Sequence, residues 1–180
     1  MILKNKHFSP ASIKQMSKKI ITINGFSKTF AMTGWRIGFV VANDDIIKKI
    51  ASLSMHINTN VNTFIQKGLI NAYNLNENFI KDFKNNIIKK SEYLDRVANK
   101  KHCLNLILPD GGFFAFLNIE KTKLSSDKFS YYLLKKYNVA VTPGIIFGKK
   151  WDNYIRVSMS ANIREFKDGI KLLCKYLDEF

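Results

Sequence analysis

Residues capable of covalent and anion-binding chemistry lie together in a polar segment between two short apolar runs. The segment contains Lys28 and Arg36, and the runs, rich in β-branched residues, occupy residues 20–23 and 37–42. Runs of this kind, bounded by Asn and Gly, predict two strands that are covered on both faces. A deprotonated lysine amine is a nucleophile, and a guanidinium group binds a phosphate or carboxylate through two parallel hydrogen bonds. Loops between rigid strands often carry such chemistry, so these two residues are the leading candidates.

Arginine is rare in this chain, so its positions are informative. Of the 29 basic residues, arginine accounts for only Arg36, Arg96, Arg156 and Arg164. Because lysine fills nearly every other basic position, an arginine at position 36 indicates a need for guanidinium geometry. For Lys28 the ordinary alternative is a solvated surface lysine, and the strand–turn–strand context favours the functional interpretation.

The segment SKTFAMTGWRIG, residues 27–38, resembles the cofactor-lysine signature of the fold-type I (class I/II) aminotransferases, and of the aspartate aminotransferase group in particular. The resemblance implies that Lys28 covalently holds pyridoxal 5'-phosphate (PLP) and is the catalytic lysine, and that Arg36 binds the cofactor's phosphate. One departure is Gly25, where many relatives have a serine that helps to bind phosphate. Phosphate binding is therefore expected to depend more on Arg36. Gly25, Gly34 and Gly38 are expected to give the segment backbone freedom.

A second informative stretch is YIRVS, residues 154–158. Strand alternation puts Tyr154, Arg156 and Ser158 on one face and the apolar residues on the other, so Arg156 is expected to point away from the apolar layer. In the resembling family an arginine in such a strand binds the α-carboxylate of the amino acid, which implies a substrate-binding role for Arg156. The ordinary alternative is an arginine on a solvated strand face.

Two further motifs, PDGGF at residues 109–113 and PGIIFG at residues 143–148, resemble turns of the same family, so the resemblance covers essentially the whole chain. It implies an α/β fold in which the carboxyl-terminal part of a PLP-binding large domain precedes a small α+β domain. The boundary is expected near Lys90, with residues 1–90 in the large-domain remnant and residues 91–180 in the small domain. Phe113 and Phe114 are expected in the core rather than at a ligand.

Apolar periodicity and capping residues predict the other elements. Ser9 and Pro10 begin a short helix, and Asn43 caps a helix that should lie on the sheet. Further helices are expected around residues 61–69, at residues 78–98, after Ser125 or Ser126, and at residues 161–177. Strands are expected at residues 104–108, 113–119, 139–142 and 154–160. The last helix should bury Ile163, Phe166, Ile170, Leu173 and Leu177.

Composition bounds the class of protein. The chain has 180 residues, 46% of them hydrophobic, which is enough for a real core. Its formal charge of +15 alone suggests nucleic acid, but the lysines are spread along the chain, so we expect neither nucleic-acid nor membrane binding. Cys103 and Cys174 form no CxxC pair, and no signal peptide or long apolar run is present, which favours a reduced, cytoplasmic protein. His7, His56 and His102 lie apart, so we expect no metal site.

The resemblance also implies groups that this chain does not supply. In the family, an aspartate that pairs with the pyridinium nitrogen of PLP, and a tyrosine shortly after it, lie farther before the cofactor lysine than the 27 residues that precede Lys28. We therefore expect the chain to be inefficient alone, as a shortened gene product or as one part of a split enzyme. The expected partners are a second subunit, as in the homodimers of the full-length family, or a separate amino-terminal half.

The expected reaction is the transfer of an amino group, through PLP, between an amino acid and a 2-oxo acid. Aspartate with 2-oxoglutarate is the first choice, and tyrosine, alanine or a broader range stays open. A PLP-dependent lyase or synthase of the same fold would share Lys28, Arg36 and Arg156. A remnant without activity stays open as well, and so does a non-enzymatic, basic nucleic-acid-binding module, for which the sequence offers only net charge.

Overall fold

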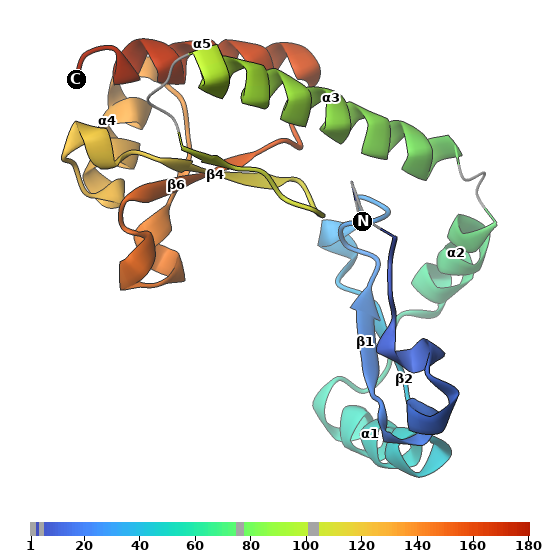
Figure 1. The fold of residues 1–180 in the computed structure, drawn as a ribbon. Helices are drawn as coiled ribbons and strands as arrows, with labels where there is room; N and C mark the ends of the chain where they lie inside the picture. Colours follow the sequence, from blue (N-terminus) through green and yellow to red (C-terminus); the bar gives the residue numbers. More distant parts are fainter. Residues whose placement is uncertain (1–2, 4–5, 75–77, 101–104) are drawn as a thin grey trace. The chain divides into compact units, whose positions relative to one another are not determined.

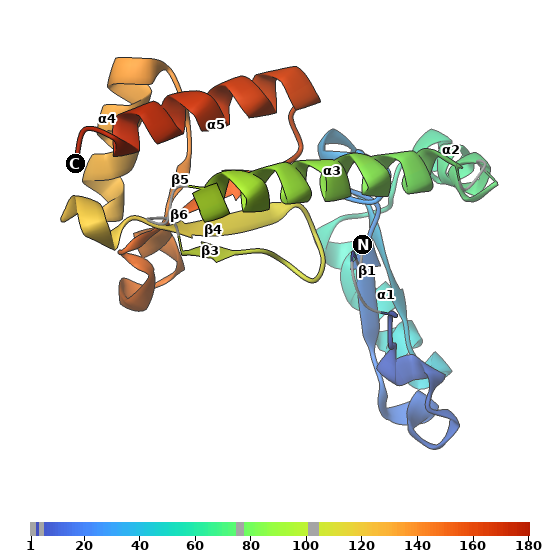
Figure 2. The same ribbon diagram turned by 45° about the horizontal axis from the view of Figure 1, so that its top comes forward.

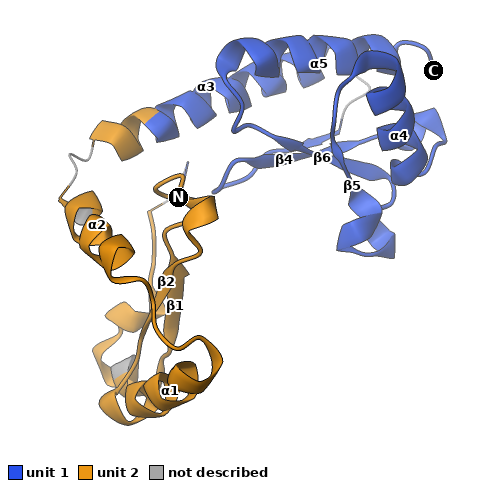
Figure 3. Ribbon diagram, turned by 180° about the vertical axis from the view of Figure 1, so that it is seen from behind, with its two compact units in different colours: residues 1–5, 83–180 blue, residues 6–82 orange. Residues whose placement is uncertain are grey.

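The computed structural model describes residues 3, 6–74, 78–100 and 105–180. Backbone contacts divide the chain into two compact units, which Figure 3 colours separately. Unit 1 comprises residues 1–5 and 83–180, and unit 2 comprises residues 6–82. The division falls inside helix α3, Asn78–Lys100, which also contains Lys90, where the sequence predicts a domain boundary. The assignment of residues 1–90 and 91–180 to two domains stays a prediction.

Unit 2 contains a two-stranded antiparallel sheet of β1, Thr22–Gly25, and β2, Gly38–Val41. β2 forms inside the predicted run of residues 37–42, whereas β1 begins two residues after the start of the predicted run of residues 20–23 and extends to Gly25. The register of the two strands places Gly25 opposite Gly38. The prediction that both faces are covered is wrong for this chain, because Ile23 is 77% exposed and Val41 is 57% exposed. Two strands alone bring too few neighbours to bury both faces of a sheet.

Two helices of unit 2 follow β2, namely α1, Asp44–Ile57, and α2, Thr63–Tyr73. As predicted, Asn43 caps α1, and its side-chain oxygen accepts a hydrogen bond from the Ile46 N–H at 3.0 Å. Helix α1 lies beside the sheet, where Ile47 and Ile50 share a groove with Ile23. None of its side chains is fully buried, however, so the helix covers the sheet only in part.

The other predicted helical segments of unit 2 form with differences. The segment after Ser9 forms two 3-10 helices, Pro10–Ser12 and Lys14–Lys19, and the Ser9 side chain makes no capping bond. In α2, Leu69 is buried, whereas Phe64 is 65% exposed. The predicted helix therefore forms, but part of its apolar face is exposed to solvent.

Unit 1 contains a four-stranded antiparallel sheet with the order β3-β4-β6-β5. The strands are β3, Leu106–Ile107; β4, Phe114–Asn118; β5, Thr142–Pro143; and β6, Tyr154–Ser158. All are shorter than predicted, and β5 overlaps its predicted range of residues 139–142 only at Thr142. Residue 104, the predicted start of β3, lies outside the described residues. The register places Phe116 of β4 directly opposite Arg156 of β6.

Helices α3 and α5, Ile163–Leu177, lie over one face of this sheet, as Figures 1 and 2 show. Helix α4, Ser126–Tyr137, packs against α5 and β5. Alternate residues of the two central strands and the inner residues of the three helices form one core. Its members include Ala115, Leu117, Ile155, Val157, Ile87, Leu94, Phe129, Leu133, Phe166, Ile170 and Leu173.

The helix predictions for unit 1 are confirmed in position and corrected in detail. Ser125 caps α4, and Asn162 caps α5 by accepting from the Glu165 N–H at 2.9 Å. The prediction that Ile163 is buried is wrong: it is 39% exposed because it is the first residue of α5 and lies at the helix end.

Among the helices of the described residues, none is both long and apolar enough to span a membrane.

Candidate active site

The loop that joins β1 to β2 in unit 2 carries both residues predicted to bind the cofactor, and its two ends are anchored in a small core. Phe26 and Ile37 are buried, and the Phe26 N–H donates to the Ile37 carbonyl at 3.3 Å. The rings of Phe30 and Phe39 lie 5.8 and 5.5 Å from the Phe26 ring. The buried residues Phe26 and Ile37 therefore hold the two ends of the loop that carries the polar residues.

Lys28 and Arg36 lie near the two ends of this loop, and both side chains are exposed. The Arg36 Nη1 atom donates to the Thr33 carbonyl at 3.0 Å, which uses one of the five N–H donors of the guanidinium. Arg36 has φ +52° and Ala31 has φ +53°, a region that residues other than glycine rarely adopt. Backbone strain of this kind concentrates at ligand sites, where the surrounding structure enforces it.

The three glycines expected to give this segment backbone freedom differ in what surrounds them. A Cβ at Gly38 would lie 2.7 Å from the Asn24 carbonyl oxygen, closer than real Cβ atoms come, so close strand pairing requires this glycine. A Cβ at Gly34 would meet nothing within 4 Å. At Gly25 it would lie 3.6 Å from the Ile37 carbonyl oxygen, an ordinary contact. Position 25 therefore has room for the serine that the resembling family often carries.

Arg156 lies on β6 of unit 1, on the sheet face opposite the helices, as strand alternation predicts. Ile155 and Val157 on either side of it are buried, whereas Arg156 is half-buried. Its Nη2 atom donates to the Thr142 hydroxyl at 3.2 Å. The prediction that this arginine points away from the apolar layer is confirmed.

Two aromatic rings lie against the Arg156 guanidinium, and sequence reasoning missed them. The central carbon of the guanidinium lies 4.1 Å from the Phe114 ring centroid and 5.0 Å from that of Phe147. Phe116, opposite Arg156, has its ring 5.0 Å from Trp151. Phe114 thus stacks on the arginine instead of joining the core, contrary to expectation. The register between β4 and β6, which the sequence does not show, brings Phe116 opposite Arg156, and the segment between β5 and β6 brings Phe147 to the guanidinium.

Lys90 is a second residue that sequence reasoning missed. Its side chain, on α3 in unit 1, is only 4% exposed, and its Nζ donates to the carbonyls of Met159 and Ala161 at 3.0 and 2.5 Å. Burial lowers the pKa of this amine. Lys90 therefore ties α3 to the turn that follows β6, the strand of Arg156.

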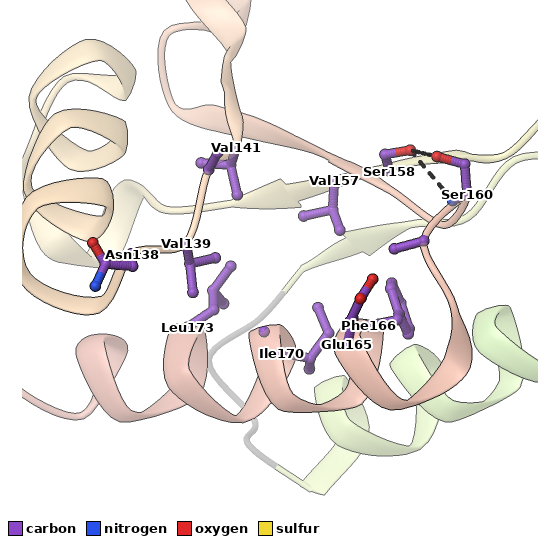
Figure 4. Close-up of a pocket in the computed structure, with 13 residues that line it drawn as sticks. Asn138, Val139, Val141, Val157, Ser158, Ser160, Glu165, Phe166, Ile170 and Leu173 are labelled. Carbon is purple, nitrogen blue, oxygen red and sulfur yellow. Dashed lines mark hydrogen bonds between the residues drawn. The ribbon is translucent and has the colours of Figure 1, made fainter.

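A pocket of about 450 Å³ lies beside the same turn, between α5 and the segment that leads into β5 (Figure 4). Its walls are mostly apolar, with Val139, Val157 and Ile170 among them. The Ser158 and Ser160 hydroxyls, 2.7 Å apart, lie at its rim. None of the three predicted site residues lines it. Lys28 and Arg36 share one loop of unit 2, and Arg156 belongs to unit 1.

The sequence of this chain matches a known protein family and several of its members. The family described as Aminotransferase class I and II matches residues 4–170. The chain is 35% identical over 176 residues to the aspartate aminotransferase of Pyrococcus abyssi, with 97% of this chain and 45% of that protein covered. It is 32% identical to aromatic-amino-acid aminotransferase 2 of Thermococcus litoralis, with 97% and 45% covered.

Solved structures of aminotransferases are also similar to this chain in fold. The crystal structure of the aromatic aminotransferase from Pyrococcus horikoshii has a TM-score of 0.88 and 34% identity, with 97% of this chain and 47% of that chain covered. The α/β fold expected from the sequence is thereby confirmed. The chain spans about half the length of the relatives that it matches. With 167 of its 180 residues inside the family match, the chain belongs to the class I and II aminotransferases.

Proposed function

We propose that this chain supplies the cofactor-lysine loop and the carboxylate-binding strand of an enzyme that moves an amino group between an amino acid and a 2-oxo acid. The observation that carries the proposal is the loop after β1, in which Lys28 and Arg36 are exposed on a base fixed by Phe26 and Ile37. Class I and II aminotransferases depend on PLP. A lysine amine attacks an aldehyde and a guanidinium fork binds a phosphate, so the loop's donors fit this cofactor.

The two residues of the loop have different tasks in this proposal. Lys28 would hold the cofactor through its amine, and the same amine would move a proton at the substrate Cα. Arg36 would bind the cofactor's phosphate. Bound PLP supplies the electron sink that makes the Cα proton acidic.

Arg156 is proposed to bind the α-carboxylate shared by amino acid and 2-oxo acid substrates. The rings of Phe114 and Phe147 lie near the guanidinium, and the Thr142 hydroxyl holds one nitrogen. Stacking fixes the plane of the group, so that its N–H edge meets a carboxylate and less side-chain entropy is lost on binding. In an active assembly, Arg156→Ala should raise KM for both substrate types and leave PLP bound; unchanged KM values would remove Arg156 from the site.

Aspartate with 2-oxoglutarate is the proposed substrate pair, because the Pyrococcus abyssi relative is named an aspartate aminotransferase. Aromatic amino acids are the second candidate. Phe114, Phe116 and Phe147 gather near Arg156, and the Thermococcus litoralis relative is named for aromatic substrates. Comparing kcat/KM for aspartate and tyrosine decides between the two. Product analysis separates an aminotransferase from a lyase or synthase of the same fold.

The 180 residues alone are proposed to be inefficient, because they match about 45% of the relatives' length and lack counterparts for the rest. The complete assembly is proposed to be a cytoplasmic enzyme that pairs subunits as the family does. Turnover of aspartate and 2-oxoglutarate by the purified chain with added PLP tests this. A rate comparable to that of full-length relatives would contradict it.

Borohydride reduction in the presence of PLP, followed by peptide mapping, tests the role of Lys28 directly. The expected result is a pyridoxyl group on Lys28 that is absent from Lys28→Ala. Lys67→Ala, which removes another exposed lysine of unit 2, should keep the label on Lys28. Labelling spread evenly over the lysines would contradict the proposal.

A further inference from the structure

Lys90, on α3, is the only charged residue that is buried among those that the structure describes. Its exposed fraction is 4%, whereas the side chain of its neighbour Lys89 is exposed. Burying an amine costs free energy unless it is hydrogen-bonded, so a buried lysine normally makes a specific contact. The reaction proposed above does not use this amine, and its contact therefore needs another explanation.

The contact of Lys90 is with the turn that joins β6 to α5. Its Nζ atom donates to the Met159 carbonyl at 3.0 Å and to the Ala161 carbonyl at 2.5 Å. Both carbonyls lie after the last residue of β6 and before the first residue of α5, so they belong to neither element. Two hydrogen bonds from one side chain therefore hold this turn against α3.

Met159 connects the same turn to the beginning of β4. Its N–H donates to the Phe113 carbonyl at 2.8 Å, and its side chain has no exposed surface. Phe114, the next residue and the first of β4, pairs with Ser158, the last residue of β6. The rings of Phe113 and Phe114 lie 4.4 Å apart. The position of the Phe114 ring therefore depends on where the Met159 backbone is held.

We propose that Lys90 is a positioning residue for Arg156, acting through the turn after β6 and through Phe114. The central carbon of the guanidinium lies 4.1 Å from the centroid of the Phe114 ring, which fixes the plane of the group. A carboxylate binds more tightly to a guanidinium whose plane is already fixed, because less side-chain entropy is lost. The Thr142 hydroxyl still holds one nitrogen, so loss of Lys90 should loosen Arg156 without releasing it. The proposal rests on the function proposed above, which assigns the substrate carboxylate to Arg156.

NMR spectra of the full chain, recorded without PLP, test the positioning. The chain has only four arginines, so its Nε–H signals are few, and Arg156→Lys identifies the signals of Arg156. The Phe114 ring should shift the side-chain protons of Arg156 upfield, and Phe114→Leu gives the value without this ring. Lys90→Met should lose most of the shift, and Lys90→Arg, which keeps N–H donors on a long side chain, should restore it. Lys89→Met, at an exposed position of the same helix, should keep the shift.

Titration with 2-oxoglutarate, followed at the same Arg156 signals, tests the consequence for carboxylate binding. Lys90→Met should weaken the affinity by about two- to tenfold, and Lys90→Arg should restore it. Signals of the buried residues Leu117 and Ile155 report whether each variant is folded. If Lys90→Met does not fold, Lys90→Gln takes its place, because its side chain is one bond shorter and still polar.

The outcomes separate this role from the proposed function. An unchanged Arg156 shift in the folded Lys90 variant overturns the proposal, and so does an equal loss of the shift in Lys89→Met. A loss that Lys90→Arg does not restore, or an affinity for 2-oxoglutarate equal to that of the parent chain, also overturns it. If the shifts follow the expected pattern but 2-oxoglutarate leaves the Arg156 signals of the parent chain unchanged, Lys90 positions Arg156 and the carboxylate role proposed for Arg156 fails.

Discussion

The two units of this chain differ in how completely they bury their apolar residues. In unit 1, α3 and α5 cover one sheet face and α4 packs against α5 and β5, and core residues such as Leu117 and Ile155 have no exposed surface. In unit 2, α1 buries none of its side chains fully, and Ile23 is 77% exposed. The unit that carries the predicted cofactor lysine is thus the less complete one.

The difference shows that a segment can have the sequence pattern of its family and still leave part of its apolar surface exposed. Burial of apolar surface is the main favourable term in folding, and it is set against the entropy of ordering the chain. Unit 1 meets that requirement with residues of its own. Unit 2 forms the predicted strands, the capped helix and the loop, but these elements do not bury all of its apolar side chains.

The largest expected effect comes from matched phenylalanine truncations in the two cores. Phe129→Ala in unit 1 should lower the free energy of unfolding by about 3–5 kcal/mol, because the site is fully buried and closely surrounded. Phe26→Ala in unit 2 should cost about 1–2 kcal/mol, because a small open core relaxes around the gap. Urea unfolding can follow each unit separately through Trp151 and Trp35, one in each unit.

The comparison of the units also predicts the order of unfolding. With Trp35→Phe leaving Trp151, and Trp151→Phe leaving Trp35, unit 2 should unfold at a lower urea concentration. A single coincident transition for both probes would contradict this, because it would show that the two units are equally stable.

A matched pair of glycine substitutions probes packing tightness. Gly144→Ala should destabilise unit 1 by about 2–3 kcal/mol, because a Cβ there would collide with the backbone oxygens of Trp151 and Tyr154, which cannot easily move. Gly34→Ala in unit 2 should change stability by less than about 1 kcal/mol, because nothing lies within 4 Å of the added atom. Equal urea midpoints for the two variants would contradict the structure of the PGIIFG turn.

The buried amine of Lys90 predicts a pH dependence specific to unit 1. Burial lowers the folded-state pKa, so the unfolded chain binds more protons between that pKa and about 10.4, and stability rises with pH across this window. Lys90→Met should cost about 1–2 kcal/mol at neutral pH by leaving the Met159 and Ala161 carbonyls without this donor. The difference from the parent chain should grow as pH rises.

Lys89→Met is the matched control for Lys90, because its side chain is exposed on the same helix. Urea midpoints measured from pH 7 to pH 10 should follow the parent chain for Lys89→Met and flatten for Lys90→Met. Parallel curves for all three proteins would mean that Lys90 does not titrate as the structure implies.

The smallest expected effect concerns the cofactor loop of unit 2. Gly25→Ser should strengthen PLP retention by about two- to tenfold in an active assembly, because it adds one hydroxyl donor at a position with room for a side chain. Gly34→Ser, in the same segment, is the control and should leave retention unchanged. Retention is measured as PLP remaining after dialysis; weaker retention in Gly25→Ser would show that the hydroxyl disturbs the site.

Local sequence signals predicted the positions of helices and strands better than they predicted which side chains are buried. Asn43 and Ser125 cap the helices that they precede, as predicted, and the long periodic segment forms α3, because capping and periodicity act within one or two turns. The prediction that Ile23 is covered failed, because burial depends on which other strands and helices are present.

By itself the sequence determined the family, the loop that carries Lys28 and Arg36, and the face of β6 on which Arg156 lies, since each depends on short spacing or on strand alternation. The tertiary structure alone decided that Phe114 and Phe147 lie against Arg156, and that Lys90 is buried against the turn after β6. The Phe114 and Lys90 contacts join segments far apart in the chain, through a strand register and a helix packing that no local pattern specifies. The Phe147 contact depends on how the segment between β5 and β6 folds back on β6.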